Sequence, residues 1–216
     1  RIPTGLRQIM SIFSRIKALI KQEPKEQIVG YSIPELKSIF TKSLLNIDPP
    51  LPDYPQNTSL EDIGIPAYYS PFLIGNEDTH KLLTLVEDNF TYATEKTFNE
   101  LPVKQYVNTQ KTEHLVFFIS TREFNSVTVR LVTNSVDFLA IIAREKFSVP
   151  PPWIVFEGYN PSWWGGDMQG AQGYYNDSYF SPFFTNLSAA EREVYYARYS
   201  APNEWIKNLE LMYDVE

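Results

Sequence analysis

Two neighbouring runs of β-branched and aromatic residues constrain the fold of this chain more than any other feature. Residues 114–120 read HLVFFIS, residues 126–132 read SVTVRLV, and the five residues between them, TREFN, fit a turn. Side chains of these types favour strands because they pack well on a pleated surface. The two runs therefore predict an antiparallel hairpin over residues 114–132. The short apolar run WIVF at residues 153–156 predicts a further strand of the same sheet.

Helical patterns lie on both sides of this sheet in the sequence. Each begins at a capping residue or at a proline that suits a first helical turn, or shows apolar positions at helical spacing. The predicted helices cover residues 34–44, 79–90, 135–146, 188–198 and 202–209. The four prolines in residues 49–55 predict an extended surface connection, and the aromatics and prolines of residues 63–74 predict an edge-like or irregular buried segment.

These patterns together define the expected architecture. We expect a single α+β domain over residues 1–216, with a central antiparallel sheet and N-terminal helices. A C-terminal aromatic loop followed by two helices completes it. The 216 residues are enough to bury a sizeable core, and neither a fixed-period repeat nor coiled-coil heptads suggest another organisation.

Residues 1–22 have the pattern of an amphipathic basic helix. They hold five arginines and lysines and no acid. The apolar side chains that recur on one face are those of Leu6, Ile9, Met10, Phe13, Ile16 and Ile20. Basic residues interrupt the stretch and no small-residue cleavage site follows, so we expect neither a transmembrane span nor a signal peptide. The segment is expected to dock on the acidic remainder of the chain, with binding to a membrane surface as the alternative.

Residues 150–216 form a module rich in glycine and aromatic residues, which begins at a triple proline. Glycines permit tight backbone conformations there, while tryptophans and tyrosines supply large contact surfaces. Such a surface suits either stacking on sugar rings or a hot spot for protein binding, and it is equally typical of a core. The candidate partner-binding residues are Glu157, Tyr159, Trp163, Trp164 and Asp167.

Composition and motifs argue against most catalytic classes. The chain has no cysteine and two histidines, His80 and His114, which lack metal-ligand spacing, so we expect no metal and no cofactor. Nucleophile motifs and nucleotide-binding loops do not occur, and we expect a binding protein rather than an enzyme. The net charge of −7 makes nucleic acid a poor partner, and the lack of cysteine favours the cytoplasm.

One enzymatic alternative stays open. A glycosidase needs only two carboxylates at a suitable separation in an aromatic cleft, and Glu157 and Asp167 flank the two tryptophans Trp163 and Trp164. A carbohydrate-active hydrolase is therefore the first alternative function. A membrane-surface adaptor that uses the basic N-terminal helix is the second.

The C-terminal third resembles bacterial polymorphic-toxin immunity proteins. In that pattern a proline-preceded tryptophan leads to a glycine and tryptophan turn, an aromatic segment, and a helix that ends in Tyr-x-x-x-Tyr, Pro and Trp. The matching positions are Pro152, Trp153, Phe156, Pro161, Trp164, Gly165, Tyr175, Leu187, Arg192, Tyr195, Tyr199, Pro202 and Trp205. A basic residue usual after the tryptophan is replaced by Gly165. The resemblance implies a cytoplasmic immunity protein that neutralises a cognate toxin, whose surface would be basic, by covering its active site or another essential surface.

Overall fold

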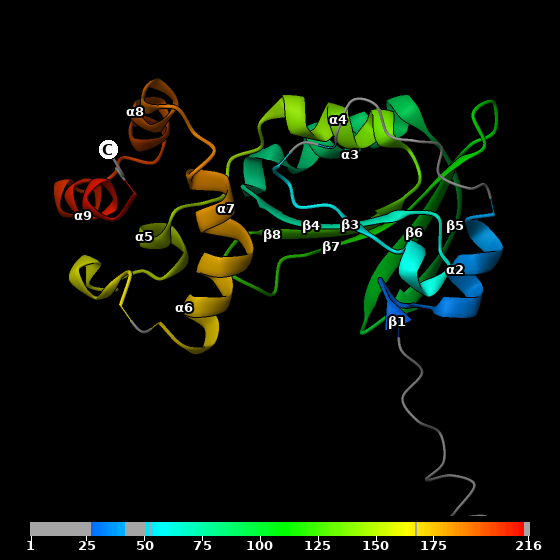
Figure 1. Cartoon of the computed structure of the whole chain (residues 1–216), viewed down its shortest axis with the longest axis horizontal. Coiled ribbons are helices and arrows are strands. Elements are labelled where there is room, and N and C mark those ends of the chain that lie inside the picture. Colours follow the sequence, from blue (N-terminus) through cyan, green and yellow to red (C-terminus); the bar gives the residue numbers. More distant parts are fainter. Residues whose placement is uncertain (1–26, 42–50, 52, 167, 214–216) are drawn as a thin grey trace, which may run out of the picture.

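The computed structural model of the protein describes residues 27–41, 51, 53–166 and 168–213. It confirms the α+β class: a six-stranded antiparallel sheet with helices on both of its faces and beside it (Figure 1). The sheet order is β3-β4-β8-β7-β6-β5. Its strands are β3 (Thr58–Ser59), β4 (Tyr68–Ile74), β5 (Thr91–Phe98), β6 (Leu101–Asn108), β7 (Glu113–Ser120) and β8 (Val127–Thr133).

The predicted hairpin forms the centre of this sheet. β7 and β8 pair antiparallel from Leu115 opposite Thr133 to Ser120 opposite Thr128. Successive side chains of a strand point to opposite faces, and both faces of β7 are covered, so Phe117 and Phe118 are each buried in a different core. Burial on both faces explains why these runs read as continuously apolar.

Helices cover both faces of the sheet. α3 (Thr79–Asn89) and α4 (Val136–Glu145), both predicted, lie along one face, and the Ser135 hydroxyl caps α4 by accepting from the Phe138 N–H (Figure 1). The opposite face carries the short hairpin of β1 (Gln27–Ile28) and β2 (Tyr31–Ser32) and the helix α2 (Ile33–Ile39). Two 3-10 turns flank β4 in the chain: η1 (Glu61–Ile63) precedes it, and η2 (Asn76–Asp78) leads directly into α3.

The β5–β6 hairpin was not predicted from the sequence. β5 is the edge strand and is exposed along most of its length, so it has no buried face to impose an apolar alternation. Its turn residues Asn99 and Glu100 both have positive φ, 48° and 63°. This is the geometry of a tight two-residue hairpin turn, which usually holds an Asn-Gly or Asp-Gly pair.

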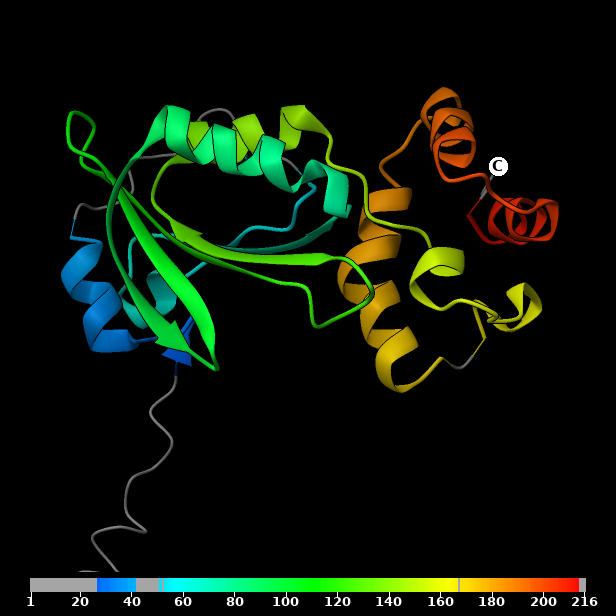
Figure 2. The same ribbon diagram turned by 180° about the vertical axis from the view of Figure 1, so that it is seen from behind.

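From residue 150 onward the chain packs beside the sheet and is helical (Figure 2). This smaller part is called the C-terminal half below, and the part before it, which contains the sheet, is called the sheet half. Two expectations are corrected here. Residues 153–156 do not form a strand but most of a single helical turn, α5 (Pro152–Val155), because Pro152 starts a helix and Val155 turns into an aromatic core. The expected aromatic loop is largely helical as well. Its elements are η3 (Pro161–Trp163), α6 (Gly170–Tyr175), the π-helical turn η4 (Asn176–Phe180) and α7 (Ser181–Phe184).

The last two helices confirm the sequence patterns. α8 (Ala189–Arg198) begins with the predicted capping box, in which Ser188 and Glu191 satisfy each other's backbone N–H groups. α9 (Asn203–Tyr213) follows Pro202. None of the helices in the part of the chain that the structure covers is long and apolar enough to cross a membrane. The predicted basic helix at residues 1–22 lies outside the described residues. The helix predicted at 34–44 is shorter than expected, because α2 ends at Ile39 with Phe40 as its C-cap, and residues 42–44 lie outside the described part.

Aromatic contacts and ion pairs join the two halves. Phe124, from the turn between β7 and β8, packs against Phe156 and Tyr175 of the C-terminal half. Arg198 of α8 donates to Glu77 at 2.8 Å and to Asp78 at 3.0 Å, just before α3. The seam is thus both packed and bridged by charge.

Candidate functional site

Large exposed apolar side chains gather on the C-terminal half. Isolated exposed apolar residues are normal, but a cluster of them marks an interaction surface. Among the residues that the structure describes, Ile63 and Tyr92 are the two on the sheet half. The other five are Ile154, Trp163, Tyr174, Val194 and Leu211.

Trp163 is the largest of these and stands on a tightly turned loop. Asn160 caps η3 by accepting from the Ser162 N–H at 2.9 Å, and Pro161 fixes the first residue of the turn. This brings Trp163 to the surface, where its side chain is 67% exposed. Tyr159 packs edge-on against it, with ring centroids 6.2 Å apart, and itself stays half-buried.

The neighbouring Trp164 has a different role. It is only 2% exposed and contacts Tyr175, Phe180 and Trp205 in the aromatic core. A side chain with so little accessible surface cannot serve as a contact for a partner without unfolding the loop. The buried Trp164 therefore fixes the loop on the core, and the exposed Trp163 points outward.

Helix α9 holds this loop in place. The Asn208 side chain donates to the Trp164 carbonyl at 3.4 Å. Gly165 has a φ of +90°, a conformation that requires glycine, and the flexible end of the Met212 side chain lies 2.4 Å from where a Cβ would stand. Because the loop is anchored by the buried Trp164 ring and by the bond to its carbonyl, Trp163 is presented on a fixed base, which lowers the entropic cost of binding.

A groove of about 440 Å³ lies between α9 and the η3 turn that carries Trp163, although Trp163 itself does not line it. Leu211, 81% exposed, supplies apolar surface at its wall, and Glu204 and Lys207 supply charge. The sequence did not predict that the exposed side of α9 lines a groove, because only the apolar residues of its buried face indicated this helix. The groove is lined by Asn160, Pro161, Ser162, Glu204, Lys207, Asn208 and Leu211.

The C-terminal half is also strongly acidic. Residues 150–216 hold nine acidic and three basic side chains, a net charge of −6. Of the three bases, Arg198 is bound to Glu77 and Asp78, and the Arg192 guanidinium lies 4.8 Å from the centre of the Phe184 ring. Glu157, beside the loop, is exposed.

Of the five predicted site residues, the structure brings Tyr159 and Trp163 into contact. Glu157 and Trp163 are exposed, Tyr159 is half-buried, and Trp164 belongs to the core. Asp167 lies outside the described residues, so the carboxylate pair of the hydrolase alternative has no measurable separation. No group of three or more histidines, aspartates or glutamates suited to a metal ion occurs within residues 27–41, 51, 53–166 and 168–213.

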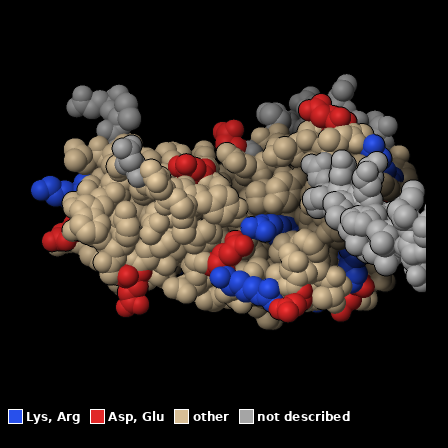
Figure 3. Space-filling view, turned by 90° about the horizontal axis from the view of Figure 1, so that it is seen from below, with Lys and Arg blue, Asp and Glu red and all other residues tan. Residues whose placement is uncertain are grey.

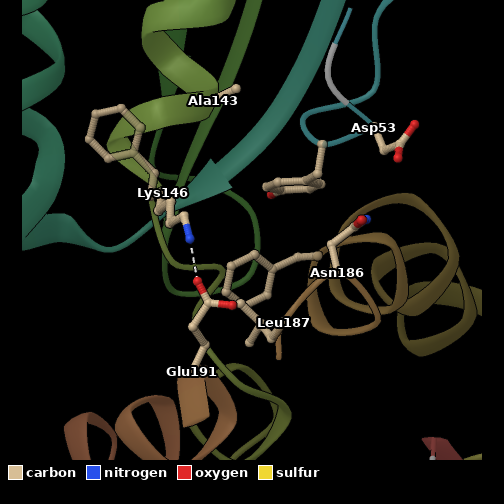
Figure 4. A pocket seen from close by; sticks show the side chains of 9 residues that line it. Asp53, Ala143, Lys146, Asn186, Leu187 and Glu191 are labelled. Atoms are coloured by element: carbon tan, nitrogen blue, oxygen red, sulfur yellow. Dashed lines mark hydrogen bonds and ion pairs between the residues drawn. The ribbon is translucent and has the colours of Figure 1, made fainter. Parts of the chain in front are cut away.

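A second hollow lies at the seam between the halves. This pocket, about 220 Å³, opens between the end of α4 and the α7–α8 connection (Figure 4). Aromatic and aliphatic side chains form most of its wall, and Lys146 and Glu191 form an ion pair at its mouth. Hydrogen bonds from Lys146 and Ser188 lower the pKa of Glu191 to about 2, so this carboxylate stays charged at neutral pH. The pocket is a feature of the seam and is separate from the Trp163 surface.

Comparisons with known proteins return no relative: no family model matches the sequence, no curated protein matches it, and no solved structure matches its fold.

Proposed function

We propose that this chain is a binding protein that neutralises a bacterial toxin, and that the surface around Trp163 contacts the toxin. The observation that carries the proposal is the presentation of Trp163. It is exposed on a loop that α9 anchors through Asn208 and the close approach at Gly165. Exposed tryptophans on rigid supports dominate the energy of many protein interfaces.

The surroundings of Trp163 suggest the chemistry of the partner. The adjacent groove combines the apolar Leu211 with the acidic Glu204, and Glu157 adds a second carboxylate nearby in the chain. Residues 150–216 carry a net charge of −6. We therefore expect a partner whose contact surface is basic at its rim and apolar at its centre, because such a surface is attracted at long range and desolvated on contact.

The toxin assignment combines this surface with the resemblance of the C-terminal third to immunity proteins. The positions of that resemblance have structural roles here. Trp164, Tyr195 and Trp205 belong to the aromatic core, while Pro161 starts η3. They account for how the module folds. The exposed residues beside them would account for which toxin it binds.

A pull-down from the native host tests the proposal, with the whole chain as bait and Trp163→Ala as the variant. A hot-spot residue costs about 2 kcal/mol or more when truncated, so we expect affinity to fall by roughly 30-fold or more. Val194→Ala is the matched control, because Val194 is equally exposed on α8, away from the groove. Trp164→Ala is unsuitable because it removes core packing.

The captured protein must also behave as a toxin. Expressed alone it should arrest growth, co-expression of the wild-type chain should restore growth, and co-expression of Trp163→Ala should restore it less well. A partner that both variants retain, or that both lose, would contradict the proposed surface. A partner that is harmless when expressed alone would contradict neutralisation while leaving the binding surface intact.

A further inference from the structure

A second groove, on the sheet half, is independent of the Trp163 surface. It lies on the sheet face opposite α3 and α4, between β1 and the turn of the β5–β6 hairpin, and has a volume of about 450 Å³. It continues into a smaller hollow of about 140 Å³ through four shared residues. Those shared residues are Phe98, Asn99, Phe118 and Arg130. Figure 3 shows this side of the molecule, hollowed between the C-terminal half and the opposite end.

The walls of this groove are aromatic and aliphatic. Phe98 and Phe118 pack together, with ring centroids 6.5 Å apart, and Tyr69 lies half-buried on β4. Ile28, Val29 and Leu60 also line the groove.

Its charges are balanced within the groove itself. The Arg130 guanidinium contacts Glu123 at 3.3 Å, and Arg122 contacts Glu100 at 3.2 Å. The walls therefore offer apolar contact surface rather than a site for an anion.

The position of the groove in the chain suggests its occupant. Gln27, Ile28 and Val29 form part of its lining, and Gln27 is where the described structure begins. Only residues 23–26 separate this lining from residues 1–22, and four residues span at most about 14 Å. A segment that precedes them is therefore held close to the groove at a high effective concentration.

The sequence of that segment matches the groove. Residues 1–22 repeat apolar side chains at helical spacing from Leu6 to Ile20, which leaves one apolar stripe in need of cover. They carry five positive charges, whereas the rest of the chain carries −12. Both the apolar stripe and the positive charge of residues 1–22 favour contact with the rest of the chain.

We propose that residues 1–22 bind the groove lined by Ile28, Tyr69, Phe98 and Phe118 through their apolar stripe. The groove is thus an intramolecular docking site, and the basic face of the segment points outward.

Because the chain has no cysteine, a single introduced thiol can carry a nitroxide spin label on the full-length protein. Ser11→Cys places the label on the face opposite the apolar stripe. We expect it to broaden the NMR signals of Val29, Leu60 and Phe98. The comparison label is at Val194→Cys on α8, which should broaden signals of the C-terminal half and leave those of the groove sharp.

Two sets of substitutions decide whether the apolar stripe is responsible. Phe13→Glu with Ile16→Glu, on the stripe, should abolish the broadening of the groove signals. Thr4→Glu with Gln8→Glu adds the same charge away from the stripe and should preserve it. Sharp groove signals in the labelled protein, or equal broadening with both pairs of substitutions, would overturn the proposal.

A vesicle-binding measurement distinguishes this proposal from the alternative that residues 1–22 bind a membrane surface. Sharp groove signals together with binding of the full chain to vesicles of phosphatidylglycerol and phosphatidylcholine would assign the segment to a membrane surface instead.

Discussion

The two halves of this protein satisfy their backbones in different ways. In the sheet half the strands pair with one another, so the core between sheet and helices can be almost wholly apolar, as around Phe72 and Leu115. In the C-terminal half short helical pieces and prolines interrupt the hydrogen-bond pattern. Buried side chains supply donors there: Tyr175 donates to the Pro150 carbonyl, and Tyr195 donates to the Val149 carbonyl at 2.7 Å.

This difference explains the aromatic composition of residues 150–216. A tyrosine or tryptophan fills a large volume and also carries one polar group that can reach a backbone carbonyl. Trp153, for example, packs against Trp205 while its indole N–H donates to the Tyr199 carbonyl at 3.0 Å. Most of the aromatic density seen in the sequence is therefore structural, and the exposed Trp163 is an exception that calls for a functional explanation.

Removing a buried ring from the aromatic core tests whether the two halves unfold as one unit, and it should change the free energy of unfolding more than the other substitutions below. Phe180→Ala removes a fully buried ring from the aromatic core and should lower the free energy of unfolding by about 3–5 kcal/mol. All four tryptophans lie between residues 153 and 205, so tryptophan fluorescence in urea reports the C-terminal half, while far-UV circular dichroism also reports the sheet. Because Leu73 of β4 packs in the aromatic core, we expect both transitions to shift together.

The matched control is Phe72→Ala, which removes a fully buried ring from the sheet half. It should also shift both transitions if the chain is one cooperative domain, as the sequence predicts. A fluorescence transition that responds to Phe180→Ala alone would show that the halves are separate folding units.

A smaller effect tests whether tyrosine hydroxyls hold the connection between the halves. Tyr175→Phe keeps the ring and removes the donor to the Pro150 carbonyl, so a buried acceptor loses its partner. We expect a loss of about 1–3 kcal/mol in the free energy of unfolding, measured by urea denaturation. Tyr92→Phe, at a tyrosine that is 52% exposed on β5, should change it by less than about 0.5 kcal/mol. Equal losses for both would show that the hydroxyl bond is unimportant.

The smallest effect concerns the ion pair across the seam. The hydrogen bond from Arg198 lowers the pKa of Glu77 below its ordinary 4.5. A carboxyl whose pKa is lower in the folded state than in the unfolded state stabilises the fold at pH values above about 4.5. This contribution is lost as the pH falls through the pKa of the folded state. Arg198→Gln should therefore cost about 0.2–1 kcal/mol at pH 7, and the difference from wild type should shrink in acid.

A double-mutant cycle with Glu77→Gln isolates this pair from the other contacts of Arg198. Urea denaturation of the four proteins at pH 7 and pH 3 gives the coupling free energy at each pH. A coupling free energy near zero at pH 7 would mean that Asp78, rather than Glu77, is the effective partner of Arg198. A coupling that persists unchanged at pH 3 would mean that the charge of Glu77 does not carry it.

Local sequence patterns were enough to predict the central hairpin, the class of fold and five of the helices, α2, α3, α4, α8 and α9. Strong periodic signals did this: two β-branched runs, the leucine spacing of α3, and the caps at Ser135 and Ser188. Such local patterns are decisive where a segment buries a well-defined face. They fail at β5, which buries little, and at residues 153–156, where a short apolar run suits helix and strand alike.

Which aromatic residues are exposed depends on the tertiary structure. Trp163 and Trp164 are adjacent and chemically identical, yet one is exposed and the other belongs to the core. The difference arises because α9 and the aromatic core lie on one side of the loop, and these elements are distant from the loop in the sequence. Burial depends on which segments pack together, and no local pattern carries that information.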